Sequence, residues 1–219
     1  MAWISLKEGT MRNAILLSLC LGLIACSSNP QRLYQDQVAN STTALAKTPA
    51  EALHNASAQP MQVAPGWRPK QWKITAEEPR LLIGNTPSNY RVFSISLKAG
   101  KPFQIKVDSW CVNACLGFSK YVLAPYLILL DQDSKEISRA SRQLQGSVGV
   151  IGQTLTGQVK SDGTYYLIVA ADNRALGELL LVDNVRVSGN GMTANAPIIQ
   201  VGMGSSPFGS VAAYLVDPQ

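Results

Sequence analysis

Residues 90–108, which read YRVFSISLKAGKPFQIKVD, decide the fold. Tyr90–Leu97 alternates apolar and polar residues with a period of two and is rich in aromatic and β-branched side chains. This pattern is typical of a strand with one buried face. Lys98–Lys101 contains a turn glycine, and Pro102–Asp108 alternates again. The two segments therefore predict a β-hairpin.

Further strands are predicted on both sides of the next turn. Tyr126–Leu130 (YLILL) is a continuous apolar run, which favours a strand buried on both faces. Asp131–Lys135 turns the chain, and Glu136–Ala140 returns. Other strand-like segments are 148–159, 164–171, 179–187, 197–201 and 210–216. Short strands without a long helical pattern predict an all-β, antiparallel β-sandwich or jelly-roll-like domain over residues 66–219.

The last two strand-like segments have two interpretations. The simpler one is that they complete the sheet. The alternative is a mobile strand, hinged at Gly202, Gly204 and Gly209, that pairs with the sheet edge of another protein.

The N-terminus has the pattern of an export signal. Arg12 precedes the apolar run Ala14–Ala25, which is too short for a membrane-spanning helix of roughly 20 residues. The run ends in Leu23-Ile24-Ala25-Cys26, which resembles the lipobox of bacterial lipoproteins. The resemblance implies that residues 1–25 are a signal peptide and that Cys26 is acylated with palmitate-type chains. The alternative is an ordinary secretory signal that contains a cysteine.

The residue after the acylated cysteine sorts such lipoproteins between membranes. Here it is Ser27 rather than an aspartate. The resemblance therefore implies a lipid anchor in the outer membrane, with the domain facing the periplasm; the alternative is display on the cell surface.

Residues 26–65 are rich in small and polar residues and show no apolar period. This composition predicts a flexible, mostly disordered tether. Within it, Thr48-Pro49-Ala50-Glu51 has an N-cap threonine, a first-turn proline and a glutamate three residues after the cap. These residues predict one short helix that extends to about Asn55.

The order of three motifs resembles a known bacterial family. VFSISLKAGKPFQIKV, APYLILLDQDSKEI and SDGTYYLIVAADN resemble the pre-peptidase C-terminal domain, a jelly-roll-like sandwich, over roughly Tyr90–Asn173. The helix-then-sandwich order around APYLILLDQ is also similar to the maltose-operon periplasmic protein family, which would imply a carbohydrate ligand. The chain departs from both families in residues 67–73, in its cysteine loop and in its glycine-rich tail.

Cys111 and Cys115 lie four residues apart in a chain expected to be exported. In an oxidising compartment this pair favours a disulfide, which requires a turn because residues four apart in a strand are too distant to be bridged. Free thiols are the alternative. A metal site would need further ligands, and the single histidine, His54, lies in the predicted tether.

Catalytic and cofactor motifs are lacking in the predicted domain. It contains no histidine for a nucleophilic triad and no glycine-rich phosphate loop. We therefore expect neither an enzyme nor a cofactor; a hydrolase that uses paired carboxylates is the alternative. Asp131, Asp133 and Glu136 are weak candidates for a calcium site, but turn residues that bond their own backbone are the simpler interpretation.

Trp67, Trp72 and Trp110 are the candidate ligand-binding residues. The first two lie among Arg68, Lys70 and Lys73, so the group would stack on a sugar, meet anionic lipid or contact a protein. The alternative is that the tryptophans cover one end of the sandwich.

The charge pattern and the missing motifs together limit the function. The formal charge of +5 is spread along the chain, which argues against nucleic acid as a partner. We expect a non-catalytic, outer-membrane-anchored module that binds a protein partner or envelope component. Carbohydrate binding is the first alternative, and a carboxylate-dependent hydrolase is the second.

Overall fold

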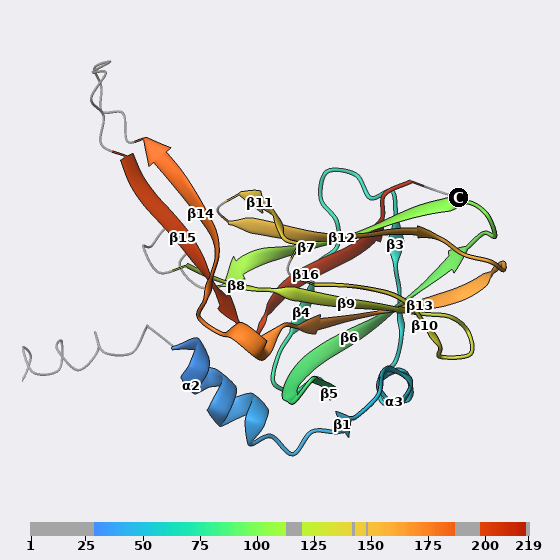
Figure 1. The fold of residues 1–219 in the computed structure, drawn as a ribbon, viewed down its shortest axis with the longest axis horizontal. Helices are drawn as coiled ribbons and strands as arrows, with labels where there is room; N and C mark the ends of the chain where they lie inside the picture. The colour runs from blue at the N-terminus through green and yellow to red at the C-terminus, as the bar shows by residue number, and fades with distance from the viewer. Residues whose placement is uncertain (1–28, 113–119, 142, 148, 187–197, 218–219) are drawn as a thin grey trace, which may run out of the picture.

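The computed structural model describes residues 29–112, 120–141, 143–147, 149–186 and 198–217, with backbone alone for 181–186 and 198–201. The chain forms a β-sandwich, which confirms the predicted fold class (Figure 1). The predicted signal peptide and Cys26 lie outside the described residues. Within these residues, no helix has the length and apolar character needed to cross a bilayer.

Two sheets make up the sandwich. The first sheet contains, in spatial order, β1 (Leu45–Ala46), β5 (Arg80–Ile83), β6 (Thr86–Leu97), β13 (Gly163–Ala171), β9 (Pro125–Leu130) and β10 (Glu136–Ala140), with β2 (Gln59–Pro60) also on β6. The second contains β11 (Gln145–Ser147), β12 (Val150–Gln158), β7 (Pro102–Val112), β8 (Lys120–Leu123), β15 (Ile198–Ser206) and β14 (Leu179–Arg186). It also includes β16 (Gly209–Leu215), which pairs with β7, β3 (Gln62–Val63) and β4 (Trp72–Ile74).

The prediction of an antiparallel sandwich needs one correction, because the sheets are mixed. Most neighbouring strands are antiparallel, but β1–β5, β2–β6, β3–β16 and β8–β15 are parallel pairs. Parallel strands require a connection that carries the chain back to the same end. Long connections, such as the one from β8 to β15, supply this return.

The predicted hairpin of residues 90–108 is wrong. Both segments are strands, but β6 pairs with β13 in the first sheet and β7 with β12 in the second. The turn between them therefore crosses from one sheet to the other. It is held by Gly100 N–H, which donates to the Val159 carbonyl, and by Ala99 N–H, which donates to the Asp162 carboxylate. Alternation alone could not show this, because both strands direct their apolar faces into one core.

The run YLILL is buried on both faces, as predicted. Leu127 and Leu129 belong to the core between the two sheets, together with Phe93 and Ile105. The alternate residues of β9, including Ile128, belong to a second apolar cluster on the outer face of the first sheet. The predicted return strand is also confirmed, because β10 pairs antiparallel with β9.

The N-terminal segment covers that outer face, so the predicted disordered tether is wrong from residue 29 onward. The segment contains α2 (Pro30–Tyr34), a π-helical turn η1 (Gln35–Ala39) and α3 (Pro49–His54). Ala46 and Ala52 are fully buried against the sheet. Small side chains allow the backbone to lie close to the sheet without any apolar period. The composition therefore predicted disorder for a segment that is packed against the domain. The helix predicted after Thr48 is confirmed as α3.

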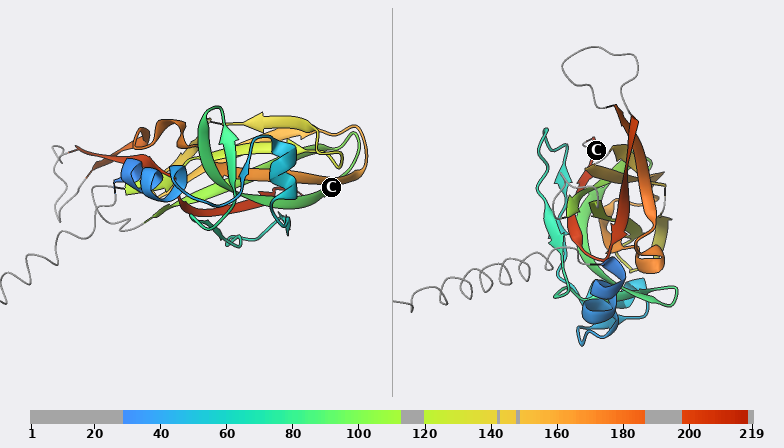
Figure 2. Two further views of the ribbon diagram at one scale, coloured as in Figure 1. Left: turned by 90° about the horizontal axis from the view of Figure 1, so that it is seen from below. Right: turned by 90° about the vertical axis from the view of Figure 1, so that its left-hand side faces the viewer.

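The β14–β15 hairpin projects from one end of the sandwich (Figures 1 and 2). Its base adjoins α2 and the short helix η2 (Asn173–Ala175). β15 and β16 both join the second sheet, which agrees with the simpler interpretation of the tail.

Candidate functional site

A cleft of about 190 Å³ lies at the base of the β14–β15 hairpin. Its lining combines carboxylates, a hydroxyl and apolar side chains: Ala124, Leu144, Asp172, Ala175, Glu178, Leu179, Leu180 and Ser205. The volume is below the 300–1,000 Å³ typical of small-molecule pockets. The cleft therefore fits a single side chain better than a whole organic ligand.

The polar wall of the cleft is held by η2. Asp172 caps this helix, and its N–H donates to the Ala124 carbonyl at 2.8 Å. Arg174 donates from Nε and Nη2 to the two Asp172 carboxylate oxygens, each at 2.7 Å. Hydrogen bonding to Asp172 raises the pKa of Arg174. The bidentate pair fixes the orientation of the Asp172 side chain, which is nearly buried.

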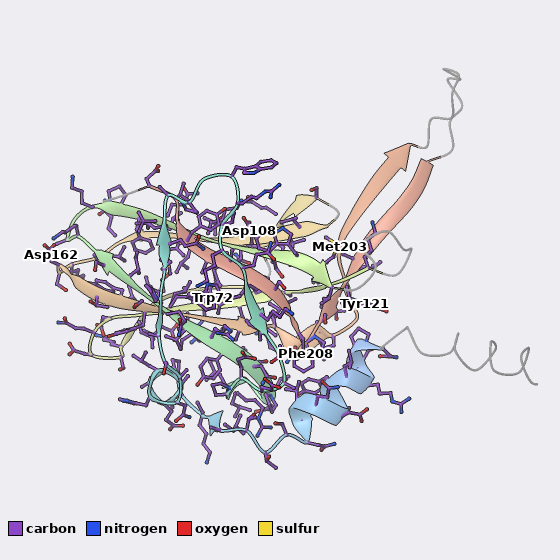
Figure 3. The ribbon with its side chains drawn as sticks, turned by 180° about the vertical axis from the view of Figure 1, so that it is seen from behind. Trp72, Asp108, Tyr121, Asp162, Met203 and Phe208 are labelled. Atoms are coloured by element: carbon purple, nitrogen blue, oxygen red, sulfur yellow. The ribbon has the colours of Figure 1, made fainter. Side chains whose placement is uncertain are left out.

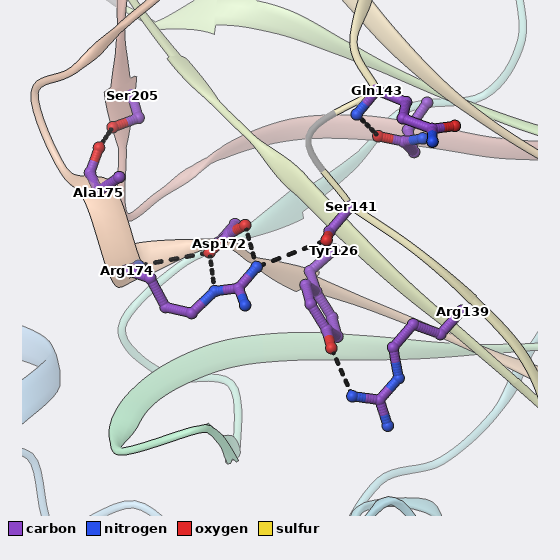
Figure 4. Close-up of polar contacts among 9 residues, drawn as sticks. Tyr126, Arg139, Ser141, Gln143, Asp172, Arg174, Ala175 and Ser205 are labelled. Carbon is purple, nitrogen blue, oxygen red and sulfur yellow. Dashed lines mark hydrogen bonds and ion pairs between the residues drawn. The ribbon is translucent and has the colours of Figure 1, made fainter.

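Tyr126 lies between Arg174 and Arg139 (Figure 4). The guanidinium carbons of Arg174 and Arg139 lie 5.0 and 5.7 Å from its ring centroid. Arg139 Nη1 also donates to the Tyr126 hydroxyl at 2.7 Å. Arg139 is itself held by Glu136, in the strand next to β9. The two cations are thus part of a fixed framework beside the cleft.

The cleft opens beside a strand edge. Among the described residues, β14 hydrogen-bonds to β15 alone, so no described strand pairs with its other edge. Its sequence, LLLVDNVR, begins with apolar residues, and the Leu179 side chain is 67% exposed. Exposed edges are usually protected by charges, proline or bulges. The β10 edge has an ion pair between Glu136 and Arg139 beside a register shift. β14 also has a register shift, between Leu179 and Leu181, but its charged residues, Asp183 and Arg186, lie in its second half, away from the cleft.

A wider hollow of about 600 Å³ lies near the β6–β7 turn. Of its lining residues only Phe103 is buried; the polar ones, including Lys101, Gln104 and Asp217, are exposed. It offers no buried polar group that would orient a ligand, so the smaller cleft is the better candidate.

The three candidate tryptophans do not form one platform. Trp72 lies on the core face of its sheet, since it pairs with buried Val211 and packs edge-on against Phe93 at 6.1 Å. Trp110 pairs with Ser210, the neighbour of Val211, and therefore lies on the opposite face. Trp67 is 88% exposed in the loop before β4, with Arg68 over its ring.

The candidate calcium ligands have other partners. Asp131 accepts from the N–H groups of Asp133 and Lys135, which is the turn role that its sequence favours. Glu136 is bound by Arg139 through both oxygens. No cluster of three or more histidine, cysteine or acidic side chains is arranged for a metal in the part of the chain that the structure describes.

Three buried or half-buried carboxylates are paired with cations. Asp108, on the outer face of β7, accepts from Lys106 at 3.1 Å and from the Tyr214 hydroxyl at 2.8 Å. Glu78 is bound by Arg91 and by Thr75, and Asp172 by Arg174. These carboxylates are therefore already engaged in ion pairs and hydrogen bonds within the domain.

The cysteine loop is described only in part. Cys111 lies near the end of β7, where it pairs with Val122 of β8. Cys115 lies outside the described residues, as does Cys26, so the predicted disulfide and acylation stay predictions. The cleft itself was missed by sequence analysis, because its lining residues come from separate segments. The one available signal was the apolar run of β14.

No protein-family model matches the chain, and no curated protein matches it. Among solved structures, the chain is similar to the pre-peptidase C-terminal domain of collagenase from Bacillus anthracis. The similarity covers 73% of this chain and 95% of that chain, with 11% sequence identity and a TM-score of 0.29.

Proposed function

We propose that this chain is a non-catalytic binding module, held by a lipid on Cys26 at the periplasmic face of the outer membrane. It takes up an extended segment of a protein partner as an additional strand on β14. The observation that carries the proposal is the edge of β14 that no described strand pairs with, whose apolar first residues lie beside a cleft of single-side-chain size. Main-chain hydrogen bonds along an edge supply affinity, and an adjacent pocket supplies specificity.

The chemistry of the cleft describes the segment that would bind. Leu144, Leu179 and Leu180 favour an apolar stem, whereas Glu178 and Asp172 favour a cationic end. Because Arg174 offsets the charge of Asp172, Glu178 supplies the excess negative charge. A partner strand with a lysine or arginine between apolar residues fits this lining.

A displayed peptide library tests the proposal. Random peptides are selected on the mature acylated protein in detergent micelles, and the consensus peptide is then titrated by fluorescence anisotropy. We expect alternating apolar residues around one cation, and slower amide exchange along β14 in the bound state. Leu179→Asp should weaken binding at least about tenfold, because it places a charge on the apolar edge.

Ile137→Asp is the matched control, because Ile137 is an exposed apolar residue, 40% accessible, on the β10 edge. It should leave binding unchanged. Equal effects of the two substitutions, or peptides that bind without changing exchange in β14, would show that the edge is not the site.

Carbohydrate binding is the second candidate, and it now depends on Trp67. The exposure of this ring, with Arg68 beside it, favours a surface contact, although Trp72 and Trp110 lie on opposite faces of the sheet. Binding of maltooligosaccharides that is lost in Trp67→Ala would favour this function. The carboxylate-dependent hydrolase ranks below both candidates because the buried acids are paired with cations.

The disulfide between Cys111 and Cys115 is part of the proposal, because export would place both cysteines in an oxidising compartment. In protein isolated from the envelope, we expect neither thiol to react with iodoacetamide until a reductant is added. Mass spectrometry of the peptide that contains both residues measures this. Alkylation without reduction would show free thiols and would argue against an oxidising compartment.

A further inference from the structure

The N-terminal segment is fixed to the base of the β14–β15 hairpin. Gln31 Nε2 donates to the Leu176 carbonyl at 2.8 Å, across 145 residues of sequence. A Cβ atom on Gly177 would lie 2.4 Å from Gln31 Nε2, so the glycine permits this close approach. Figure 2 shows α2 beside the base of the hairpin.

The contacts that hold the segment continue after α2. Pro30 and Val38 are buried, and the Arg80 guanidinium donates to the carbonyls of Val38 and Thr43 at 2.8 and 2.7 Å. The chain is therefore joined to the domain from its first described turn, and not only after a long flexible tether.

Very little chain separates Cys26 from this attachment. Ser27 and Ser28 lie between Cys26 and Asn29, the N-cap of α2. Fully extended, three residue steps span only about 10 Å. An acyl chain on Cys26 would therefore hold the base of the hairpin, and the cleft there, close to the bilayer surface.

We infer that the partner segment lies at the membrane surface, because α2 holds the base of the hairpin, and with it the cleft, close to the acylated cysteine. The inference rests on the proposed function and gives it a partner class: the juxtamembrane segment of a protein embedded in, or anchored to, the same membrane. Asp162 lies at the end of the sandwich opposite the hairpin (Figure 3), so in this orientation that end would face away from the membrane.

Depth-dependent fluorescence quenching tests this orientation. Dansylalanine is introduced at Leu179, or at exposed Lys160 beside the distal turn, in acylated protein on vesicles that carry nitroxide headgroups. The two ends of the sandwich lie roughly 35 Å apart, which is about the length of an eleven-residue strand such as β7. We expect strong quenching at position 179 and little at position 160.

A linker variant provides the control. Twenty glycine and serine residues inserted between Ser28 and Asn29 leave every described contact intact but add an average reach of about 25 Å. Quenching at position 179 should fall towards that at position 160. Equal quenching at both positions of the native-length protein, no effect of the linker, or failure of the protein to bind vesicles would each overturn the inference.

The location of the partner is tested with the selected consensus peptide displayed on vesicles that also carry the protein. The native-length protein should bind the peptide on a short lipid spacer better than on a long polymer spacer, and the linker variant should lose this preference. Equal binding to both displays by the native-length protein would overturn the partner class. Peptide binding in micelles is measured separately, so failure of the orientation and failure of the edge as a binding site are distinguishable.

Discussion

Single polar side chains hold together segments that lie far apart in the sequence. Residues 30–58, which cover the outer face of the first sheet, are called the N-terminal cover. The Arg80 guanidinium donates to two carbonyls of this cover, and the Tyr90 hydroxyl donates to the Ala52 carbonyl at 2.8 Å. Burial raises the pKa of Tyr90 far above its usual value, which keeps the hydroxyl available as a donor. Each of these side chains satisfies backbone groups of a segment that has no sheet of its own.

Replacing Arg80 with methionine tests the first of these contacts. The substitution retains much of the apolar stem but leaves two carbonyls without a charged donor, and a hydrogen bond to a charged group contributes roughly 1.5–3 kcal/mol. We expect the free energy of unfolding, measured by urea denaturation, to fall by about 3 kcal/mol, with faster proteolysis near 39–43. Arg80→Lys should show a smaller loss. A change below about 0.5 kcal/mol, as for a surface substitution, would contradict the assignment.

Asp162 provides a pH test at the β6–β7 turn. The Ala99 N–H at 2.8 Å and the Lys98 ammonium at 3.1 Å hold its pKa below the usual 3.8. Because the folded pKa is the lower one, this carboxylate stabilises the fold above the unfolded pKa, and the contribution is lost as pH falls through the folded value.

Carbon-detected NMR should therefore give Asp162 a titration midpoint below 3.8. Lys98→Ala should restore the midpoint only in part, because the larger cause is the backbone N–H of Ala99. Full restoration by Lys98→Ala, or a normal midpoint in the unsubstituted protein, would refute the assigned cause.

Helices and strands are positioned here by their ends as much as by their faces. α3 begins where Thr48 Oγ1 accepts from Glu51 N–H at 3.2 Å, while the Glu51 carboxylate accepts from Lys47 N–H at 2.7 Å. The β6–β7 turn is similarly held by Asp162, from the turn before β13. Local capping residues can be recognised in the sequence, but the strand that each turn leads to depends on distant partners.

Thr48→Ala tests whether the cap holds α3 against the sheet. Loss of an N-cap hydroxyl costs about 1 kcal/mol. We expect a decrease of this size in the free energy of unfolding, together with faster hydrogen exchange at the Glu51 amide. Thr48→Ser keeps the acceptor and should behave like the unsubstituted protein. Unchanged exchange at Glu51 in Thr48→Ala would show that packing alone fixes the helix.

The whole molecule has three layers: the N-terminal cover, the first sheet and the second sheet. The cover is needed because the first sheet is apolar on both faces, as the separate clusters around Leu129 and Ile128 show. An uncovered face of this kind would expose a large apolar patch to water. The cover and the base of the projecting hairpin therefore lie within one connected unit, joined by the Gln31–Leu176 hydrogen bond.

Cys26→Ser should separate anchoring from folding. Without the thiol no acyl chain can be attached, so we expect the protein to move from the membrane fraction to the soluble periplasmic fraction. Its urea midpoint should match that of the acylated protein in detergent, because the described contacts begin at Asn29. Membrane association of Cys26→Ser protein from which residues 1–25 have been removed would contradict a lipid anchor on this residue.

The sequence by itself determined the strands of five or more residues, the double burial of YLILL, the Asp131 turn and the short helix after Thr48. All of these depend on periodicity or on residues within a few positions, which one chain displays directly. Only the tertiary structure decided which sheet each strand joins, that β6 and β7 form no hairpin, and that residues 30–58 cover a sheet. The cleft beside β14 was also decided only by the tertiary structure. These features arise from pairing and burial between distant segments. An alternating sequence is the same whichever strand it pairs with, so it does not identify the partner.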